Sequence, residues 1–452
     1  MRCNQRPGRG ARRLAAVLTA AVLAGCGGGG GGEAVAPPDC SVAGQKQWLA
    51  TYMDDWYFWY RLSPQPAPEP YVDVESYFDA LLYAGSDPAF PPDRWSRSES
   101  TESFNRFYGD GSTLGYGVAV AGLEVTGEPS QPLYVRHVEP LSPAAALGVR
   151  RGDEVLSLNG RAARDVIAAD DFSALTAAAA SDRLTLELRR DGAQRMVTIG
   201  AAVFALTPVS GTAVLNAGPG RKLGYVAVKD MINQALAPLE TTFSRFVAEG
   251  VSDVVLDLRY NGGGLVSTGG TVASYVAGTR GQGRSYATLL YNDKRAAGNQ
   301  SFGFTPLLSA LTLPRVFVLI GRRTCSASEQ VINGLRGVGV EVVAIGETSC
   351  GKPVGSLPAS ACGRTYSVVN FESVNDRNEG RYFDGFDATC PVDEDFTVPQ
   401  GTDADPLLAA ARHHAETGLC PPQAGLRQQP LRRQPVRPLE RPSDEREVML
   451  AR

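Results

Sequence analysis

The sequence predicts an α/β core that follows a β-rich domain and a small N-terminal helical domain. The core is predicted over 204–420, where apolar runs of strand length alternate with amphipathic runs of helix length. The β-rich domain is predicted over 111–203, because short apolar segments there are separated by Asn-Gly and Asp-Gly turns. The helical domain is predicted over 41–110, where aromatic and aliphatic residues recur at helical spacing. A chain of 452 residues is long enough for all three parts.

The first 40 residues are typical of an exported protein. A basic start precedes an apolar run over 14–25, which is shorter than the ~20 apolar residues that a membrane span needs. The run ends in "LAGC", which resembles the lipobox of bacterial lipoproteins. That resemblance implies a signal peptide over 1–25, lipidation of Cys26 and a Gly-rich tether over 26–40. We therefore expect a lipid-anchored protein of the bacterial cell envelope that faces the periplasm or the exterior. The alternative is an ordinary cleavage site beside a chance cysteine.

Cysteine usage and charge limit the classes of function. Cys3 would leave with the signal peptide and Cys26 would carry lipid. The even number that remains favours disulfides in an exported protein without fixing their pairing. No CxxC pair or His/Cys cluster has the spacing of metal ligands, so neither a metal nor another cofactor is expected. A net charge of −4 gives no sign of nucleic-acid binding. The remaining cysteines are Cys40, Cys325, Cys350, Cys362, Cys390 and Cys420.

The helical domain begins with the segments 47–62 and 74–85, whose Trp and Tyr residues are expected in its core. In the β-rich domain a strand over 133–138 leads to a short helix, and 184–199 reads as a hairpin. The stretch "SPAAALGVRRGDEVLSLNG" resembles a PDZ domain. Such a domain takes an extended C-terminus as an added strand and holds its carboxylate with loop N–H groups. The alternative is a PDZ fold used only as a structural brace.

By that resemblance, the carboxylate-binding loop of the PDZ-like domain would be Gly115, Tyr116, Gly117 and Val118.

The α/β core places a polar turn, "GRRTCSASEQ", between a buried strand and a helix. Ser326 and Glu329 stand as S-x-x-E, which is a capping box, and capping alone is one interpretation. The other is that Ser326 is a nucleophile, which needs a base to take its proton. None of the three histidines, at 137, 413 and 414, falls among the strands of the core, so a Ser-His-Asp triad is not expected.

Lys352 is the predicted base. It follows the strand "VEVVAIG", which should pair in parallel with the strand before Ser326, so both strands end at one edge of the sheet. A lysine can accept a proton only in its neutral form, which burial favours. Glu347, five residues upstream, could oppose this by holding the ammonium charged. Taken alone, Lys352 is better interpreted as a surface loop lysine, and only its place beside the serine turn favours the catalytic role.

A glycine-rich loop follows another buried strand, in "LDLRYNGGG" (256–264). Glycines let backbone N–H groups turn into a site without obstruction by Cβ, and such groups can stabilise an oxyanion. A tight turn is the plain alternative, and the loop lacks the Lys-Ser/Thr ending of a phosphate-binding loop. A closing helix is expected over 405–420. The segment 421–452 is rich in Arg and Pro and is predicted to be a disordered tail, with contact to anionic lipid as the alternative.

Together these motifs resemble the C-terminal processing (tail-specific) protease family of serine peptidases. The family's S-A-S-E motif matches 326–329, its G-K motif matches 351–352, and "DRWS" at 93–96 belongs to the matching N-terminal segment. The resemblance implies a Ser326–Lys352 dyad and an oxyanion site built from the backbone of Ala327, Gly262 and Gly263. It also implies protein or peptide substrates whose free C-termini are captured by the PDZ domain.

The chain departs from the family pattern after the lysine. Many members carry a glycine there and a glutamine a few residues on, whereas residues 353–356 are Pro-Val-Gly-Ser. This leaves the partner of Lys352 open. It also leaves a second hypothesis, a catalytically inactive peptide-binding or scaffold lipoprotein. A carbohydrate-handling lipoprotein is a third, but no carboxylate pair suggests a glycosidase.

Overall fold

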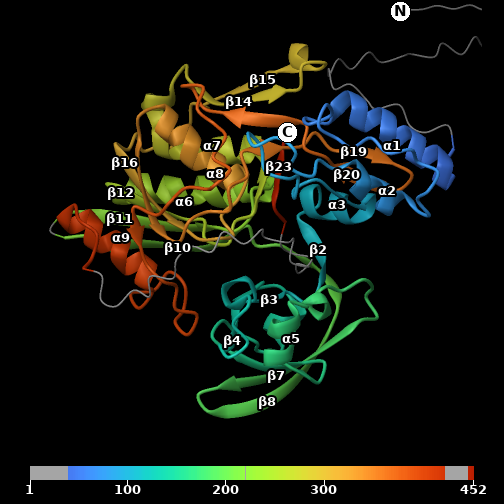
Figure 1. Ribbon diagram of the computed structural model, residues 1–452. Helices are drawn as coiled ribbons and strands as arrows, with labels where there is room; N and C mark the ends of the chain where they lie inside the picture. The colour runs from blue at the N-terminus through green and yellow to red at the C-terminus, as the bar shows by residue number, and fades with distance from the viewer. Residues whose placement is uncertain (1–38, 219, 423–445, 452) are drawn as a thin grey trace, which may run out of the picture. The chain divides into compact units, whose positions relative to one another are not determined.

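The computed structural model describes residues 39–218, 220–422 and 446–451, which belong to one compact unit. The expected signal peptide, Cys26 and nearly all of the tether lie outside the described residues. The described residues include no helix that combines the length and the apolar character needed to cross a membrane. The predicted fold class is confirmed: an α/β core, a β-rich domain and an N-terminal helical domain are all present (Figure 1).

The N-terminal domain packs aromatic side chains between short helices. Its first helix ends at Trp56 rather than continuing to residue 62, because Tyr57 takes extended backbone and its buried hydroxyl donates to Asp93 at 2.7 Å. A disulfide between Cys40 and Cys362 ties the start of this domain to a hairpin of the core. Its elements are α1 (Val42–Trp56), α2 (Val74–Leu81), β1 (Arg97–Ser100) and α3 (Thr101–Tyr108).

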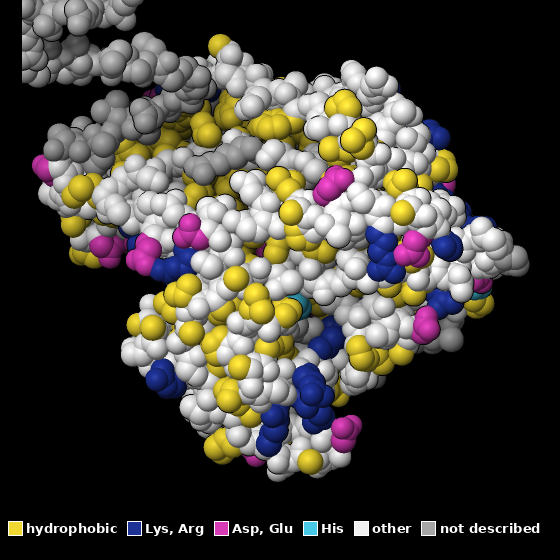
Figure 2. All heavy atoms as spheres, turned by 180° about the vertical axis from the view of Figure 1, so that it is seen from behind, with side chains coloured by type: hydrophobic (Ala, Val, Ile, Leu, Met, Phe, Trp, Pro, Cys, Tyr) yellow, Lys and Arg dark blue, Asp and Glu magenta, His cyan; other side chains and the backbone are white. Residues whose placement is uncertain are grey.

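The β-rich domain is a sheet of order β3-β4-β5-β7-β8, and two short helices contribute side chains to its core. The predicted hairpin is present, with Asp191 and Gly192 in left-handed backbone between β7 and β8. Figure 2 shows basic side chains over this part of the molecule, and they are arginines because residues 111–203 contain no lysine. The elements are β2 (Ser112–Gly115), β3 (Val118–Val120), β4 (Leu133–Val138), α4 (Pro143–Ala146), β5 (Glu154–Leu158), β6 (Arg161–Ala162), α5 (Ala163–Ala169), β7 (Arg183–Arg190), β8 (Ala193–Gly200) and β9 (Ala202–Ala205).

The core is built on a sheet of order β10-β11-β12-β16-β17-β22, parallel except for β10. The expected parallel pairing of the strands before Ser326 and Lys352 is therefore confirmed as β16 beside β17. The main elements are β10 (Val209–Asn216), β11 (Lys222–Val228), α6 (Leu236–Glu249), β12 (Asp253–Asp257), β13 (Gly263–Leu265), α7 (Val266–Ala277), β16 (Arg315–Ile320), α8 (Ala327–Gly337), β17 (Glu341–Gly346), β22 (Cys390–Pro391) and α9 (Pro406–Thr417).

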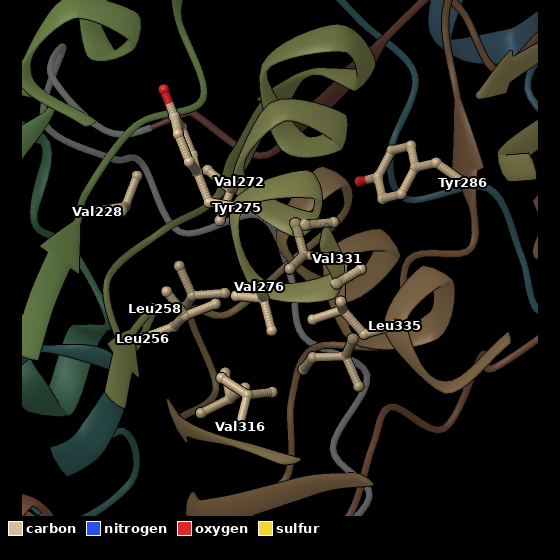
Figure 3. Packing of buried hydrophobic residues seen from close by; sticks show 14 of the residues in the cluster. Val228, Leu256, Leu258, Val272, Tyr275, Val276, Tyr286, Val316, Val331 and Leu335 are labelled. Carbon is tan, nitrogen blue, oxygen red and sulfur yellow. The ribbon is translucent and has the colours of Figure 1, made fainter. Parts of the chain in front are cut away.

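Two apolar layers cover the faces of this sheet. On one face α6, α7 and α8 pack over the strands, and Figure 3 shows Val276, Val331 and Leu335 meeting Leu256 and Val316 there. On the other face α9 packs its buried leucines against the strands. A second, smaller sheet and a hairpin complete the core, from β14 (Ser285–Tyr291), β15 (Gln300–Gly303), β18 (Val354–Gly355), β19 (Ala359–Ala361), β20 (Arg364–Ser367) and β21 (Phe371–Val374).

The segment 446–451 differs from the expectation of a disordered tail. Residues Val448–Leu450 form a strand, β23, that pairs in parallel with β13. All three side chains are buried, because the strand lies in an apolar part of the core. The prediction of disorder is therefore wrong for 446–451. Residues 423–445 lie outside the described residues.

Candidate active site

Ser326 occupies a strained turn directly before α8. Its backbone has φ 64° and ψ −120°, a conformation that residues with a Cβ adopt only when the surroundings hold them there. Two hydrogen bonds fix the turn: Thr324 Oγ1 donates to Leu258 O at 2.8 Å, and Cys325 N donates to Asn261 O at 3.1 Å. The Ser326 hydroxyl is fully buried and has no hydrogen-bond partner among the described residues.

Glu329 joins the serine turn to the lysine loop. Its carboxylate accepts N–H donations from Ser326 at 2.9 Å and from Gly351 and Lys352 at 2.8 Å each, and a hydroxyl donation from Ser349 at 2.6 Å. The expected capping of the helix by Glu329 is therefore present, and the same carboxylate also caps the loop that carries Lys352. Complete burial raises the pKa of Glu329 to about 7, although the donated hydrogen bonds act in the opposite direction.

A disulfide fastens the same two segments covalently. Cys325 precedes Ser326 and Cys350 lies two residues before Lys352, and their Cα atoms are 5.2 Å apart. The six expected cysteines form three disulfides, the others being Cys40–Cys362 and Cys390–Cys420. Because Glu329 lies beside the Cys325–Cys350 bond, this small cluster is a cross-linked cap and not a set of free metal ligands.

Lys352 is buried in the site and is not a surface lysine. Its side chain is only 2 % exposed, and Nζ donates to the backbone oxygen of Glu447 at 2.8 Å. Glu347 forms an ion pair with Arg322, with 3.5 Å between Oε2 and Nε. The structure therefore brings Ser326 and Lys352 to one site through Glu329, but their side chains are not hydrogen-bonded to each other.

The glycine loop lies against the serine. A Cβ on Gly263 would stand 2.8 Å from Ser326 Cβ and 3.0 Å from Ala327 N, and its φ of 111° also requires glycine. The Gly263 N–H, however, donates to Asn261 Oδ1 at 2.8 Å. In this arrangement the Gly263 N–H is therefore not available to an oxyanion, and its role there stays a prediction. Gly262 and Ala327 stay as candidate donors.

The sequence does not predict the roles of two contributors to the site, Asn261 within the glycine loop and Glu447. Asn261 is fully buried and organises the loop, since its Nδ2 also donates to Val228 O at 2.8 Å. Glu447 meets Lys352 through its backbone oxygen, so no side-chain motif could have revealed it. The apolar triplet "VML" at 448–450, inside an otherwise polar stretch, was the available signal for the segment that carries it.

The predicted carboxylate loop of the PDZ-like domain connects β2 to β3. Gly115 ends β2, Val118 begins β3, and Tyr116 is buried between them. Gly117 has a φ of 74°, and a side chain there would collide with Ser142, whose hydroxyl donates to Gly117 O at 3.3 Å. The loop is thus fixed by the start of α4, and its use in peptide binding stays a prediction.

Two of the three histidines contact residues outside the serine turn and the lysine loop. His137 is buried beside Glu139, which also pairs with Lys229 at 3.0 Å. His414 packs its ring against Phe317 on α9's side of the sheet. That no histidine serves Ser326 stays a prediction.

Comparisons with known proteins match three parts of the chain to known families. The family model described as "Peptidase family S41" matches residues 222–380, its N-terminal domain matches 44–97, and a PDZ domain model matches 134–190. The chain is 29 % identical over 255 residues to the chloroplastic C-terminal processing peptidase of Tetradesmus obliquus. That match covers 52 % of this chain and 51 % of the relative. It is 26 % identical over 258 residues to a carboxyl-terminal-processing protease of Picosynechococcus sp. That match covers 56 % of this chain and 59 % of the relative. The matched regions thus span between half and three fifths of these relatives.

The fold agrees with a solved structure assigned to the S41 proteases, from Bacteroides fragilis. It has a TM-score of 0.62 at 24 % identity, and the match covers 81 % of this chain and 96 % of that one. The three family models follow one another along the chain in the order in which the structure places the helical domain, the β-rich domain and the α/β core. Residues 222–380, the α/β core, are thus similar to peptidase family S41, the N-terminal segment is similar to that family's N-terminal domain, and a PDZ domain lies between them.

Proposed function

We propose that the chain is a serine endopeptidase in which Ser326 attacks the peptide carbonyl and Lys352 is the general base. The observation that carries this proposal is the buried Glu329 carboxylate, which binds the backbone of both residues and so fixes them in one site. Burial of Lys352 further supports it, because a lysine accepts a proton only as the neutral amine, the form that a site without water favours.

The reaction proceeds by proton transfer and acyl transfer. The Ser326 hydroxyl gives its proton to Lys352 Nζ as its oxygen bonds to the carbonyl carbon. The resulting oxyanion is stabilised by N–H groups, for which Gly262 and Ala327 are the candidates. Lys352 then returns the proton to the leaving amine, and the C–N bond breaks. Water, deprotonated by Lys352, hydrolyses the acyl ester and restores the serine.

Substrate choice is assigned to the PDZ domain, which would bind the free C-termini of protein or peptide substrates through residues 115–118. The fixed, glycine-dependent geometry of Gly117 supports this, since backbone N–H groups must be held in place to bind a carboxylate.

A catalytically inactive scaffold is the second candidate. It is favoured by one observation, the absence of a hydrogen bond between the Ser326 hydroxyl and any described residue.

Replacing the nucleophile separates the two candidates. Ser326→Ala should lower kcat by at least about 10⁴-fold. Ser328→Ala is the matched control. Its hydroxyl donates to Asn261 O at 3.0 Å, and loss of one such bond, worth about 1 kcal/mol, should cost no more than about tenfold. The activity of each variant is measured by peptide hydrolysis and by fluorophosphonate labelling. A Ser326 that is never labelled and a Ser326→Ala variant with unchanged turnover would support the inactive scaffold. Peptide binding by Ser326→Ala should persist and should weaken when Gly117→Val is added.

Replacing the base tests the lysine. Lys352→Arg should be as inactive as Lys352→Ala, because arginine keeps its proton at any working pH. In the unmodified protein kcat/KM should rise with pH as a basic group loses its proton, with no inflection near the ordinary histidine pKa of about 6.5. The control variant replaces His137, His413 and His414 together. If that variant folds but has lost its activity, a histidine is the base and the Ser-Lys mechanism is wrong.

Glu329 should make the stability of the protein depend on pH. Its pKa of about 7 in the folded state lies above its ordinary value of 4.5, so the folded state binds the proton more tightly. The stabilisation of the folded state by protonated Glu329 is complete below pH 4.5 and is lost as pH rises through about 7. Relative to Glu329→Gln, which does not titrate, the unfolding free energy should fall by about 3 kcal/mol over this range. Chemical denaturation at a series of pH values measures it. A pH-independent difference would mean that Glu329 is ionised throughout.

We also propose that the protein is held in the bacterial cell envelope by lipid on Cys26. The support is the "LAGC" motif and the glycine run that follows it, together with bacterial relatives of the same family. Cys26→Ser should move the protein from the membrane fraction to the soluble fraction and abolish incorporation of radiolabelled fatty acid. If Cys26→Ser leaves membrane association unchanged, the lipid anchor is wrong.

A further inference from the structure

The segment Arg446–Ala451 passes through the candidate active site as a strand. On one side β23 pairs in parallel with β13, the continuation of the glycine loop. On the other side Ser356 N donates to Met449 O at 2.8 Å, and Ala451 N donates to Ser356 O at 3.1 Å. In Figure 1 this segment, red at the end of the colour scale, lies among elements that are far from it in the sequence. Two strand edges are thus joined by a segment from the far end of the chain.

The side chains of the segment fill apolar positions on both of its faces. Val448 and Leu450 lie in a cluster with aromatic residues of α3, while Met449, fully buried, lies in the main core cluster. In an extended peptide successive side chains point to opposite sides, and an added strand is recognised by the sites that its alternate side chains fill. The residues that surround Val448 and Leu450 are Phe104, Phe107, Tyr108, Phe204, Leu206, Ile232 and Leu265.

Arg446 anchors the start of the segment. Its guanidinium forms an ion pair with Glu99, donates to Ser103 Oγ at 2.8 Å and lies 4.5 Å from the ring centre of Phe107. An acidic side chain beside an aromatic face is a site for a basic residue. The groove therefore suits an extended peptide with a basic residue followed, two positions later, by an apolar run.

The backbone of the segment meets the reacting groups. The Glu447 carbonyl accepts the hydrogen bond from Lys352 Nζ, and Gly263 separates Ser326 from Val448 with no room for a Cβ. A side chain on Gly262 would likewise collide with the Arg446 carbonyl. With the segment in place Ser326 is fully buried and Lys352 is 2 % exposed.

We propose that Arg446–Ala451 is an intramolecular pseudosubstrate that inhibits the enzyme until it leaves the groove. The inference rests on the proposed peptidase function of the same site. On this proposal the segment, which lies across Gly263 from the nucleophile, keeps a substrate carbonyl away from Ser326, and it accepts a hydrogen bond from the base through the Glu447 carbonyl. An occupant carried by the same chain has an effective concentration on the order of mM, so a peptide substrate at micromolar concentration competes poorly. The site between β13 and Ser356, once vacated, would bind extended peptides that carry a basic residue followed, two positions later, by an apolar run.

The first experiment releases the segment from a protein that has already folded. A recognition sequence for a site-specific protease is placed between Pro422 and Arg446 in the full chain, and the purified protein is cut and passed through gel filtration. Intact mass confirms loss of the fragment. Fluorophosphonate labelling of Ser326 should then be at least tenfold faster than in the uncut protein. Adding back a synthetic peptide of residues 446–452 should slow it again.

A second experiment does not depend on catalysis. In the Ser326→Ala background, the same peptide carrying a fluorophore should bind the cut protein and not the uncut protein, as measured by anisotropy. In the uncut full chain, Met449→Asp would bury a charge and should weaken the binding of the segment to the core. The fluorescent peptide should then bind in its place. Leu419→Asp, at a position that is 69 % exposed, is the matched control and should not allow the peptide to bind.

Three results would overturn the inference. The first is that the fragment leaves but labelling of Ser326 is not accelerated. The second is that excess peptide cannot displace the fragment, which would make it a fixed part of the core. The third is that intact mass shows removal of the residues after Glu447 by Ser326, which would make the segment a substrate. Failure of the peptidase proposal is distinguishable. Ser326 would then stay unlabelled in every variant, while peptide binding still appeared only after cutting and upheld the occupancy of the groove.

Discussion

One buried carboxylate organises the candidate active site. Glu329 accepts hydrogen bonds from the backbone of Ser326 and from that of Gly351 and Lys352, which lie in two different loops of the sheet. A buried carboxylate without such donors is unfavourable, so the three N–H groups and the carboxylate stabilise one another. The disulfide between Cys325 and Cys350 repeats the same connection covalently. Neither loop can move independently of the other.

The parallel sheet explains why these loops meet at all. The glycine loop follows β12, the serine turn follows β16 and the lysine loop follows β17, three adjacent parallel strands whose carboxyl ends share one edge. The glycine loop after β12 is held in position by Arg259, which lies near its start. Its buried guanidinium contacts Asp257 at 2.9 Å and Asp405, the N-cap of α9, at 2.7 Å. The helix on the far face of the sheet thus helps to position the loop on the site.

Much of this arrangement was predictable from the sequence, because it depends on local patterns and on adjacency. Strand-helix-strand order places Ser326 beside Lys352, and S-x-x-E identifies Glu329 as a cap. The remainder depends on tertiary contacts that leave no local pattern. The donation of the Gly263 hydrogen to Asn261 depends on loop geometry, and the strand at 448–450 needs two open strand edges that only the folded core supplies. Three apolar residues in a polar, Pro-rich stretch predict no strand on their own.

The bond between Cys40 and Cys362 has a consequence for how the chain folds during its synthesis. The two cysteines are separated by 322 residues, so Cys40 emerges long before its partner exists. The N-terminal helices must therefore wait, with an unpaired thiol, until most of the α/β core has been made. Wrong pairing with Cys325 or Cys350 becomes possible late in that interval, since both are made shortly before Cys362. Oxidative folding of this protein consequently favours late disulfide formation, or an isomerase that exchanges early bonds.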